Sequence, residues 1–249
     1  MKNLKKVLSL VLALAMALSL MTAAFAADAS DYKDYSKVTY KEAVDVMTAA
    51  GIFNGGDGNN FNPDATLNRE QAAKIITYML VGQEKADKLT AAVAPYADVA
   101  ANRWSAGAIA YCTNEGILAG DGNGRFNPTA PVLGTQFAKM LLVALGYDAK
   151  VANYVGNDWA INVAADAVNA GIAPKGIVLA DAMTREEAAQ MAFQTLTADM
   201  VYYTNKGTTV NTPDGTQVVV GASAPVKVAN SKTDDYRTVS ADRDEVQQF

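Results

Sequence analysis

Hydrophobic residues recur at helical spacing in two stretches of the chain that each follow a glycine-rich loop. The first stretch carries Ala72, Ile75, Ile76, Met79 and Leu80, and the second carries Phe137, Met140, Leu141, Ala144 and Leu145. Apolar side chains at positions i, i+3, i+4 and i+7 fall on one face of an α-helix. The pattern therefore predicts two amphipathic helices that bury one face each.

The loops in front of these helices are copies of one another. The segment GIFNGGDGNNFNP, residues 51–63, returns without a gap as GILAGDGNGRFNP, residues 116–128. A weaker third copy links Trp104 to Gly116 with Trp159 to Gly171, and its loop up to Arg185 is shorter and lacks the Gly-Asp-Gly turn. Self-similarity at a fixed spacing is typical of repeat architectures.

Each repeat is interpreted as a helix, a glycine-rich loop and a second helix. We expect glycines just beyond the ends of the three first helices, at Gly51, Gly116 and Gly171. Asn68 and Thr184 are expected to cap the second helices. Because one helical hairpin cannot bury both apolar stripes, the three units are expected to share a core in a mainly α fold.

The N-terminal segment predicts export. Residues 1–26 contain a basic start, an apolar run from Val7 to Met21 and a final Ala24-Phe25-Ala26, which together form a signal-peptide pattern. The competing interpretation is a membrane anchor, but the run of about 15 residues is shorter than the roughly 20 that span a bilayer. No later stretch is apolar enough to cross a membrane, so we expect no integral membrane span in the mature chain.

From Val201 the helical pattern gives way to strand signals. Thr, Val and Tyr dominate, a turn is expected at 213–215, and Val218 to Val220 form an apolar run. Residues 201–249 are therefore predicted to form a β-hairpin-like segment and a polar tail. The tail is either flexible or the beginning of a longer protein, and the second reading is favoured.

Composition excludes several functions. The formal net charge is −5 and falls by three more units when the lysines of the signal peptide are removed, which argues against nucleic acid as the main partner. The chain has no histidine, which excludes histidine-dependent triads and histidine metal sites. The single Cys112 lies in an apolar helical pattern and is expected to be a buried structural thiol. The Asp-Gly-Asn loops lack the oxygen ligands and final Glu of a calcium-binding EF-hand.

The repeats resemble the S-layer homology (SLH) family. The resemblance rests on Trp104 with Ala108-Ile109, on Gly120-Asp121-Gly122 with Phe126-Asn127-Pro128, and on an Arg-Glu pair at the family's "TRAE" position. It implies three repeats at 36–82, 95–147 and 148–200, after a linker at 27–35, arranged as a pseudo-three-fold spindle. It also implies a cell-surface location and non-covalent binding to an acidic secondary cell-wall polysaccharide, which often carries pyruvate ketals.

The resemblance assigns ligand-binding roles unevenly. The "TRAE" arginine matches Arg69 and Arg185, whereas the second repeat has Gly134 there and loses its cation. The tryptophan of the first helix matches Trp104 and Trp159. The aspartate that precedes each first helix matches Asp98 and, more loosely, Asp34. One or two competent grooves are therefore expected rather than three, with no metal and no cofactor.

Plainer interpretations stand beside these assignments. Arg69 and Arg185 fall in the first turn of a helix, where unpaired N–H groups and the macrodipole favour anions. Alternatively, each arginine pairs with its neighbour, Glu70 or Glu186, and only supports the fold. The two tryptophans begin apolar stripes, which favours a core role over sugar stacking, and Phe61 and Phe126 are expected to plug the loops into the core.

The resulting hypothesis is a non-enzymatic wall anchor. Two alternatives stay open: a lattice-forming S-layer subunit, and the N-terminal anchor of a longer extracellular hydrolase.

Overall fold

The computed structural model describes residues 28–212 and 217–228, and these residues are mainly helical. Six longer helices are α2 (Lys41–Ala49), α3 (Arg69–Val81), α5 (Ala106–Asn114), α6 (Gly134–Ala144), α7 (Trp159–Asn169) and α8 (Arg185–Thr197). Shorter pieces are η1 (Ala29–Asp31), η2 (Tyr35–Lys37) and α4 (Gln83–Ala86). Four short strands follow: β1 (Val201–Tyr202), β2 (Thr208–Asn211), β3 (Gln217–Val220) and β4 (Val226–Lys227). The helix-loop-helix units predicted from the sequence are therefore present three times.

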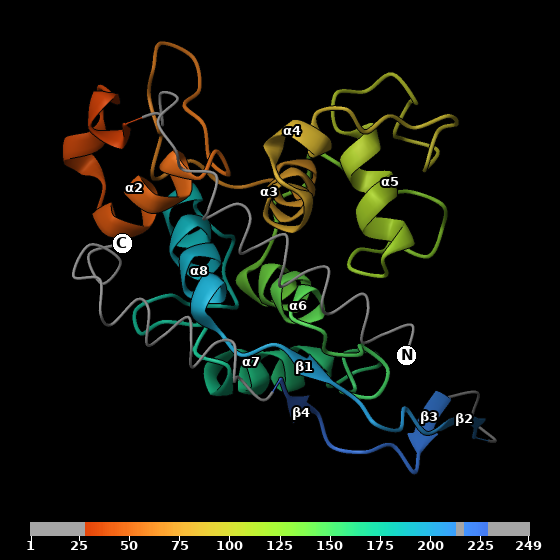
Figure 1. The fold of residues 1–249 in the computed structure, drawn as a ribbon. Coiled ribbons are helices and arrows are strands. Elements are labelled where there is room, and N and C mark those ends of the chain that lie inside the picture. Colours follow the sequence, from red (N-terminus) through yellow and green to blue (C-terminus); the bar gives the residue numbers. More distant parts are fainter. Residues whose placement is uncertain (1–27, 213–216, 229–249) are drawn as a thin grey trace.

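The second helices of the three units form the centre of the molecule, and the first helices lie outside them (Figure 1). Each outer helix packs on the central helix of another unit: α5 on α3, α7 on α6, and α2 on α8. The last of these contacts joins the beginning of the helical region to its end. Because every outer helix is covered by a neighbouring unit, the three units share one core, as expected from the apolar stripes.

A ring of three backbone hydrogen bonds closes the top of the central helices. The N–H of Leu67 donates to the carbonyl of Met183 at 2.8 Å, Met183 donates to Val132 at 2.9 Å, and Val132 donates to Leu67 at 3.0 Å. The three residues occupy the same position in the three units, two residues before the central helix begins. The cyclic pattern gives the fold its pseudo-three-fold character.

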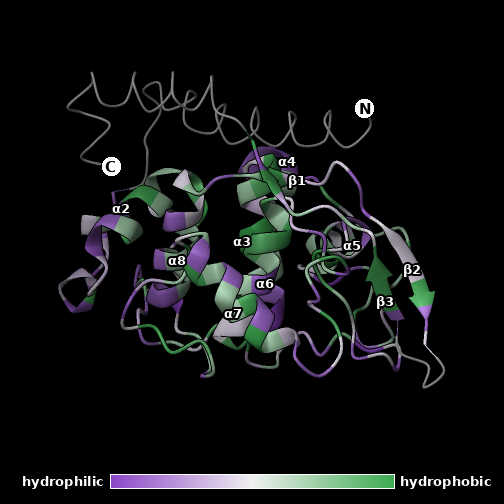
Figure 2. Ribbon diagram, turned by 90° about the horizontal axis from the view of Figure 1, so that it is seen from below, coloured by the Kyte–Doolittle hydropathy of each residue, from purple (hydrophilic) through white to green (hydrophobic). Residues whose placement is uncertain are grey.

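The hydrophobic core runs through all three units. Phe61 and Phe126 are fully buried, which confirms the prediction that these loop residues plug the core. Figure 2 shows hydrophobic residues on α3 and α6 in the middle of the molecule. Cys112 is also buried, where its sulfur lies 3.3 Å from the Thr77 hydroxyl. Full burial of a phenylalanine stabilises the fold by about 1.5–3 kcal/mol, so the two loops are held firmly.

Capping residues set the ends of the helices as the sequence predicted. Gly51, Gly116 and Gly171 have φ between 69° and 76°, a left-handed conformation that ends a helix at little cost for glycine. Asn68 and Thr184 accept hydrogen bonds from the backbone N–H three residues later, at 2.9 Å and 3.3 Å. Each also belongs to a capping box.

The β segment attaches to the second and third units through its first residues. Val201 donates its N–H to the carbonyl of Leu145 at 2.9 Å, and Lys206 pairs with Asp148 at 2.5 Å. Strands β1 and β4 pair antiparallel, and β2 pairs with β3 in a separate hairpin. This confirms the strand signals from Val201 onward.

Three predictions fall on residues outside the described ranges: the signal peptide at 1–26, the turn at 213–215 and most of the polar tail. Among the residues that are described, none of the helices has the length and hydrophobicity needed to cross a membrane.

Candidate functional site: two arginine grooves

Two of the three boundaries between units contain an arginine that reaches from a central helix across to the next glycine-rich loop. We call the contact of Arg185 with residues 51–63 the first groove. The contact of Arg69 with residues 116–128 is the second groove. Both arginines are the first residue of their central helix, so the fold brings together a helix start and a loop that are far apart in the sequence.

The two arginines make equivalent contacts. In the second groove, Nε of Arg69 donates to the Phe126 carbonyl at 2.8 Å and Nη2 donates to the Ala119 carbonyl at 2.9 Å. In the first groove, Nε of Arg185 donates to the Phe61 carbonyl at 2.9 Å and Nη2 donates to the Asn54 carbonyl at 3.0 Å. A guanidinium has five N–H donors, so each arginine keeps further donors for a ligand.

An aromatic ring supports each guanidinium from one side. The Cζ atom of Arg69 lies 4.5 Å from the centroid of the Phe126 ring, and that of Arg185 lies 5.1 Å from the Phe61 ring. A cation over an aromatic face is attracted by the ring quadrupole. The ring and the two carbonyls together fix the plane of the guanidinium before any ligand arrives.

Both guanidinium groups are half-buried, and neither forms an ion pair with a carboxylate among the described residues. Burial lowers the pKa of Arg69 and of Arg185 below the usual arginine value, yet arginine remains charged at neutral pH. Nearby acidic groups, Asp98 and Asp34 among them, oppose this shift. Each groove therefore contains a desolvated cation that an anionic ligand could neutralise.

The alternative in which each arginine pairs with the next residue is wrong. Glu70 accepts hydrogen bonds from Nε and Nη2 of Arg103 at 2.7 and 2.8 Å, and from the Ser105 hydroxyl at 2.6 Å. Glu186 accepts from the backbone N–H of Thr39 at 2.7 Å. Both glutamates point away from the neighbouring arginine because residue 2 of the helix faces the start of the outer helix. Their role in joining units was not foreseen from the sequence.

The argument from unpaired helix N–H groups is also wrong. The N–H groups of Arg69 and Glu70 donate to the carbonyls of Ala130 and Pro128 at 3.0 and 2.9 Å. The N–H groups of Arg185 and Glu186 likewise donate to carbonyls of the first unit at 2.9 and 3.2 Å. The next unit satisfies these amides, so the guanidinium groups, and not these N–H groups, are the donors that remain for an anion.

Asp34 and Asp98 bind backbone N–H groups of the two glycine-rich loops. The two carboxylate oxygens of Asp98 accept from the N–H groups of Phe126 and Asn127, both at 2.8 Å. Those of Asp34 accept from Phe61 and Asn62, both at 2.7 Å. These contacts fix Phe61 and Phe126, whose carbonyls each accept one of the two hydrogen bonds from the arginine. Direct contact of either aspartate with a ligand stays a prediction.

At the third boundary between units, the backbone of the third loop occupies the space that an arginine side chain takes at the other two. Gly134 stands where the other units have arginine, and a Cβ atom there would lie 2.7 Å from Cα and 2.9 Å from the carbonyl oxygen of Leu179. The N–H of Thr135 donates to this same carbonyl at 2.7 Å. The shortened third loop thus brings its backbone to the position that a side chain would need, which explains why glycine is found there.

The two tryptophans differ in exposure. Trp104 is 55% exposed, so the core interpretation is wrong for this residue, whereas Trp159 is partly buried and packs against the core. Each lies near a lysine at the same position of a central helix: Lys74 is 5.6 Å from the Trp104 ring and Lys139 is 5.5 Å from the Trp159 ring. A ligand-binding role for either ring stays a prediction.

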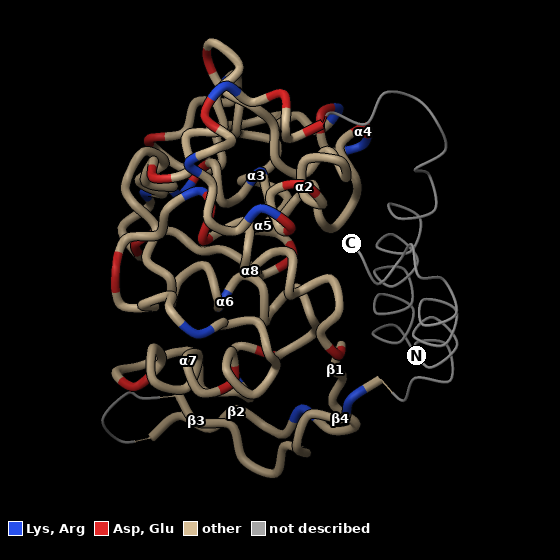
Figure 3. The backbone as a smooth tube through the Cα atoms, turned by 90° about the vertical axis from the view of Figure 1, so that its left-hand side faces the viewer, with Lys and Arg blue, Asp and Glu red and all other residues tan. Residues whose placement is uncertain are grey.

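Acidic and basic residues are interspersed along the helical part of the chain (Figure 3). The positive charge relevant to an acidic ligand is therefore local, at the arginines.

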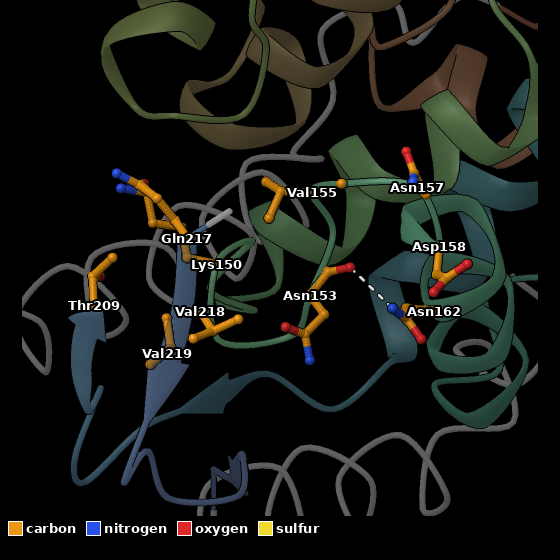
Figure 4. Close-up of a pocket in the computed structure, with 11 residues that line it drawn as sticks. Lys150, Asn153, Val155, Asn157, Asp158, Asn162, Thr209, Gln217, Val218 and Val219 are labelled. Carbon is orange, nitrogen blue, oxygen red and sulfur yellow. Dashed lines mark hydrogen bonds between the residues drawn. The ribbon is translucent and has the colours of Figure 1, made fainter. Parts of the chain in front are cut away.

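A separate open pocket lies between the hairpin β2–β3 and the segment before α7 (Figure 4). Its side chains are mostly amides and small residues, such as Asn153, Asn157, Asn162 and Thr209. None of the six ligand-binding residues predicted from the sequence lines it. The pocket and the arginine grooves are thus different places on the molecule.

Comparison with known proteins identifies S-layer homology domains at residues 31–73 and 95–138. These segments contain the loops of both arginine grooves. The chain is 28% identical over 236 residues to a cell surface protein of Thermoanaerobacter kivui, which covers 93% of the chain and 30% of that protein. It is 30% identical over 150 residues to a surface layer protein of Brevibacillus choshinensis, covering 60% of the chain and 13% of that protein.

A weaker similarity extends to a protein of Bacillus anthracis described as an uncharacterized cell wall amidase. The identity is 26% over 170 residues, covering 62% of the chain and 30% of that protein. The chain thus spans less than a third of the length of these relatives. The comparisons indicate a secreted, cell-surface protein with two segments similar to the S-layer homology domain.

Proposed function

We propose that this chain anchors an exported protein to the bacterial cell wall by binding an acidic secondary cell-wall polysaccharide in the two arginine grooves. The observation that carries the proposal is the repeated cradle around Arg69 and Arg185. In each, a half-buried guanidinium is held by two carbonyls and a ring, and no carboxylate of the described residues pairs with it.

The chemistry fits an acidic sugar unit. A carboxylate or phosphate can accept two parallel N–H bonds from the free donors of a guanidinium, in a geometry that a lysine cannot reproduce. Because the guanidinium is already fixed and partly desolvated, little ordering is needed when the ligand binds. Carboxylates of pyruvate ketals are suitable anions. We further propose that the exposed ring of Trp104 stacks on a sugar ring of the polymer.

Two further parts belong to the proposal. Residues 1–26 are a signal peptide that is removed on export, and residues 148–200 are a third S-layer homology unit without a functional groove. The third unit would complete the helical core, since α8 covers α2 and carries Arg185 into the first groove.

Co-sedimentation with isolated cell walls tests the proposal. The mature chain is expected to pellet with walls that carry their polymer and to stay in solution with walls stripped of it. Equal pelleting with both preparations would contradict the proposal.

Substitution of the arginines locates the site. Arg69→Ala and Arg185→Ala should each weaken binding about ten-fold or more, because a hydrogen bond to a charged group contributes about 1.5–3 kcal/mol. Lys88→Ala is a matched control, since Lys88 is an exposed cation that pairs with Glu84 one helical turn away. Circular dichroism checks that the helices persist. Undiminished binding by a folded double variant would place the ligand elsewhere.

The relatives suggest an alternative, a subunit that forms a surface lattice. A surface layer protein is among them, and the alternative would require contacts between copies. Electron microscopy of the purified chain separates the two functions, since only a lattice subunit assembles into sheets.

A further inference from the structure

One of the differences between the two arginine grooves is the residue whose carbonyl meets the guanidinium. The carbonyl that accepts Nη2 of the arginine belongs to Asn54 in the first groove and to Ala119 in the second. Both residues are followed by glycine, Gly55 and Gly120. The first groove therefore contains an Asn-Gly sequence at its arginine, and the second contains Ala-Gly.

Glycine is fixed at this position by packing. A Cβ atom on Gly55 would lie 2.7 Å from a carbon of the Tyr32 ring, and one on Gly120 would lie 2.6 Å from the same atom of the Tyr96 ring. No comparable constraint acts on residue 54, because Ala119 provides the same carbonyl in the second groove. The structure thus requires the glycine but does not require the asparagine.

Asn-Gly is the dipeptide in which an asparagine side chain is most easily attacked by the following backbone nitrogen, because glycine has no side chain to hinder the approach. Asn54 and Gly55 are both exposed, and within the described residues neither the Asn54 carboxamide nor the Gly55 N–H has a hydrogen-bond partner. In this part of the chain nothing competes for the two groups that would react.

We propose that Asn54 is a site of spontaneous isoaspartate formation, and that this modification places a carboxylate directly on Arg185 and inactivates the first groove. The consequence for ligand binding rests on the function proposed above, whereas the modification itself does not.

The reaction needs only water. The Gly55 nitrogen, after losing its proton, forms a bond to Cγ of Asn54, and the bond from Cγ to the side-chain nitrogen breaks, so that ammonia leaves and a cyclic imide remains. Water then cleaves the bond between the original main-chain carbonyl carbon and the Gly55 nitrogen. The chain now runs through Cγ, and the original carbonyl group becomes a free carboxylate.

That original carbonyl oxygen is the atom that accepts Nη2 of Arg185 at 3.0 Å. A neutral acceptor is thereby exchanged for a charged one at the same place. A carboxylate paired with a guanidinium is a stronger partner than a carbonyl and would compete with the carboxylate of a ligand. Cleavage of the imide on its other side gives ordinary aspartate, which also brings a negative charge next to the groove.

Ageing of the purified chain at mildly alkaline pH, followed by peptide mapping with an isoaspartyl methyltransferase assay, measures the modification. Isoaspartate is expected at residue 54, and also at Asn123, whose Asn-Gly sequence lies in an exposed turn and serves as an internal clock. An unmodified Asn54 in chains whose Asn123 has fully converted would overturn the proposal.

A second readout follows Arg185 without any ligand. Reaction with phenylglyoxal, which modifies guanidinium groups, is measured on a chain carrying Asn123→Ala, so that the loop around Arg69 is not modified. The reaction is expected to slow at Arg185 after ageing and to stay unchanged at Arg69. Equal reactivity of Arg185 before and after conversion would contradict the predicted ion pair.

Two variants connect the chemistry to binding. Because Asn123 lies in the loop of the second groove, both variants and the parent used for binding carry Asn123→Ala, which removes the other Asn-Gly sequence. In this background Asn54→Ala copies the second groove, so it should retain wall binding before and after ageing. Ala119→Asn gives the second groove the Asn-Gly sequence of the first. Ageing should therefore abolish binding at both grooves of this variant, whereas in the parent it abolishes binding at the first groove alone. If fresh parent chain does not bind walls, the proposed function fails, while the peptide map and the phenylglyoxal reaction still decide the modification. Undiminished binding by aged parent chain with residue 54 converted would overturn the inactivation.

Discussion

The carboxylate of Glu70 and the guanidinium of Arg103 form a two-pronged ion pair, with N–O distances of 2.7 and 2.8 Å, that joins the central helix of the first unit to the start of α5. Glu70 is 3% exposed, and the Ser105 hydroxyl provides a third hydrogen bond. Glu70 follows Arg69 in the sequence but has a separate role. It connects two units, while Arg69 has no carboxylate partner among the described residues.

Acid should weaken this connection. Burial alone would raise the pKa of the Glu70 carboxyl, but the hydrogen bonds from Arg103 and Ser105 outweigh burial and hold the pKa below its usual value. A depressed folded-state pKa contributes stability above the unfolded-state pKa of about 4.3, and that contribution is lost as pH falls through the folded value.

We therefore expect Glu70→Gln to lower the free energy of unfolding at pH 7 by about 2 kcal/mol. The difference from the parent should shrink below pH 4. Urea unfolding at several pH values measures both effects. Glu84→Gln is the control, because Glu84 is exposed and its ion pair with Lys88 lies at the surface. A constant difference across the whole pH range would show that Glu70 is not the titrating group.

Gly134 should resist replacement by any larger residue. A Cβ atom would lie 2.7 Å from the backbone of Leu179, which cannot move aside as a flexible side chain could. We expect Gly134→Ala to reduce stability by about 1–3 kcal/mol. Gly134→Arg should cost more, and it should not create a third groove.

Thermal unfolding tests this expectation against Gly56→Ala. The nearest atom to a Cβ on Gly56 is a side-chain nitrogen of Asn62 at 3.3 Å, so that variant should unfold close to the parent temperature. A Gly134→Arg chain that is stable and gains wall binding would show that the third boundary can open.

Cys112 should report global unfolding. Burial raises the pKa of the thiol to about 12, so the reactive thiolate is scarce at pH 8 and the sulfur is also inaccessible. We expect an aromatic disulfide reagent to react slowly with the native chain and rapidly above the urea midpoint. Rapid reaction of the native chain would indicate local opening of the contact between α5 and α3.

Trp104 should contribute little to stability. The Trp104 side chain is 55% exposed, whereas the Trp159 ring packs against the core. We therefore expect Trp104→Ala to lower the free energy of unfolding less than Trp159→Ala does. The comparison of the two unfolding midpoints measures this difference. If Trp104 stacks on a sugar ring, as proposed, its variant should lose wall binding while keeping the parent midpoint.

Much of the fold was predictable because its signals are local. Helical spacing, the glycines after the outer helices and the caps at Asn68 and Thr184 depend on interactions within a few residues, and all of them are found in the structure. The repeated loops predicted three similar units, and the need to bury two apolar stripes per unit predicted a shared core.

Contacts between units could not be predicted from the sequence, because they depend on how distant segments pack. The sequence placed Arg69 next to Glu70, and pairing of neighbours was a reasonable alternative. In the structure successive residues of a helix point in different directions, so Glu70 meets Arg103 and Arg69 meets the carbonyls of Ala119 and Phe126. The same contacts satisfy the helix N–H groups that were expected to be unpaired.

By itself, the sequence determined the number of helical units, their boundaries at glycines and caps, and the presence of arginine in two units and glycine in one, because these depend on residue type and spacing. Only the tertiary structure decided what each arginine touches, why Gly134 can have no side chain, and that the carbonyl of Asn54 lies on Arg185. Those relationships join segments from different units, and they exist only after α2 has packed on α8 and closed the ring.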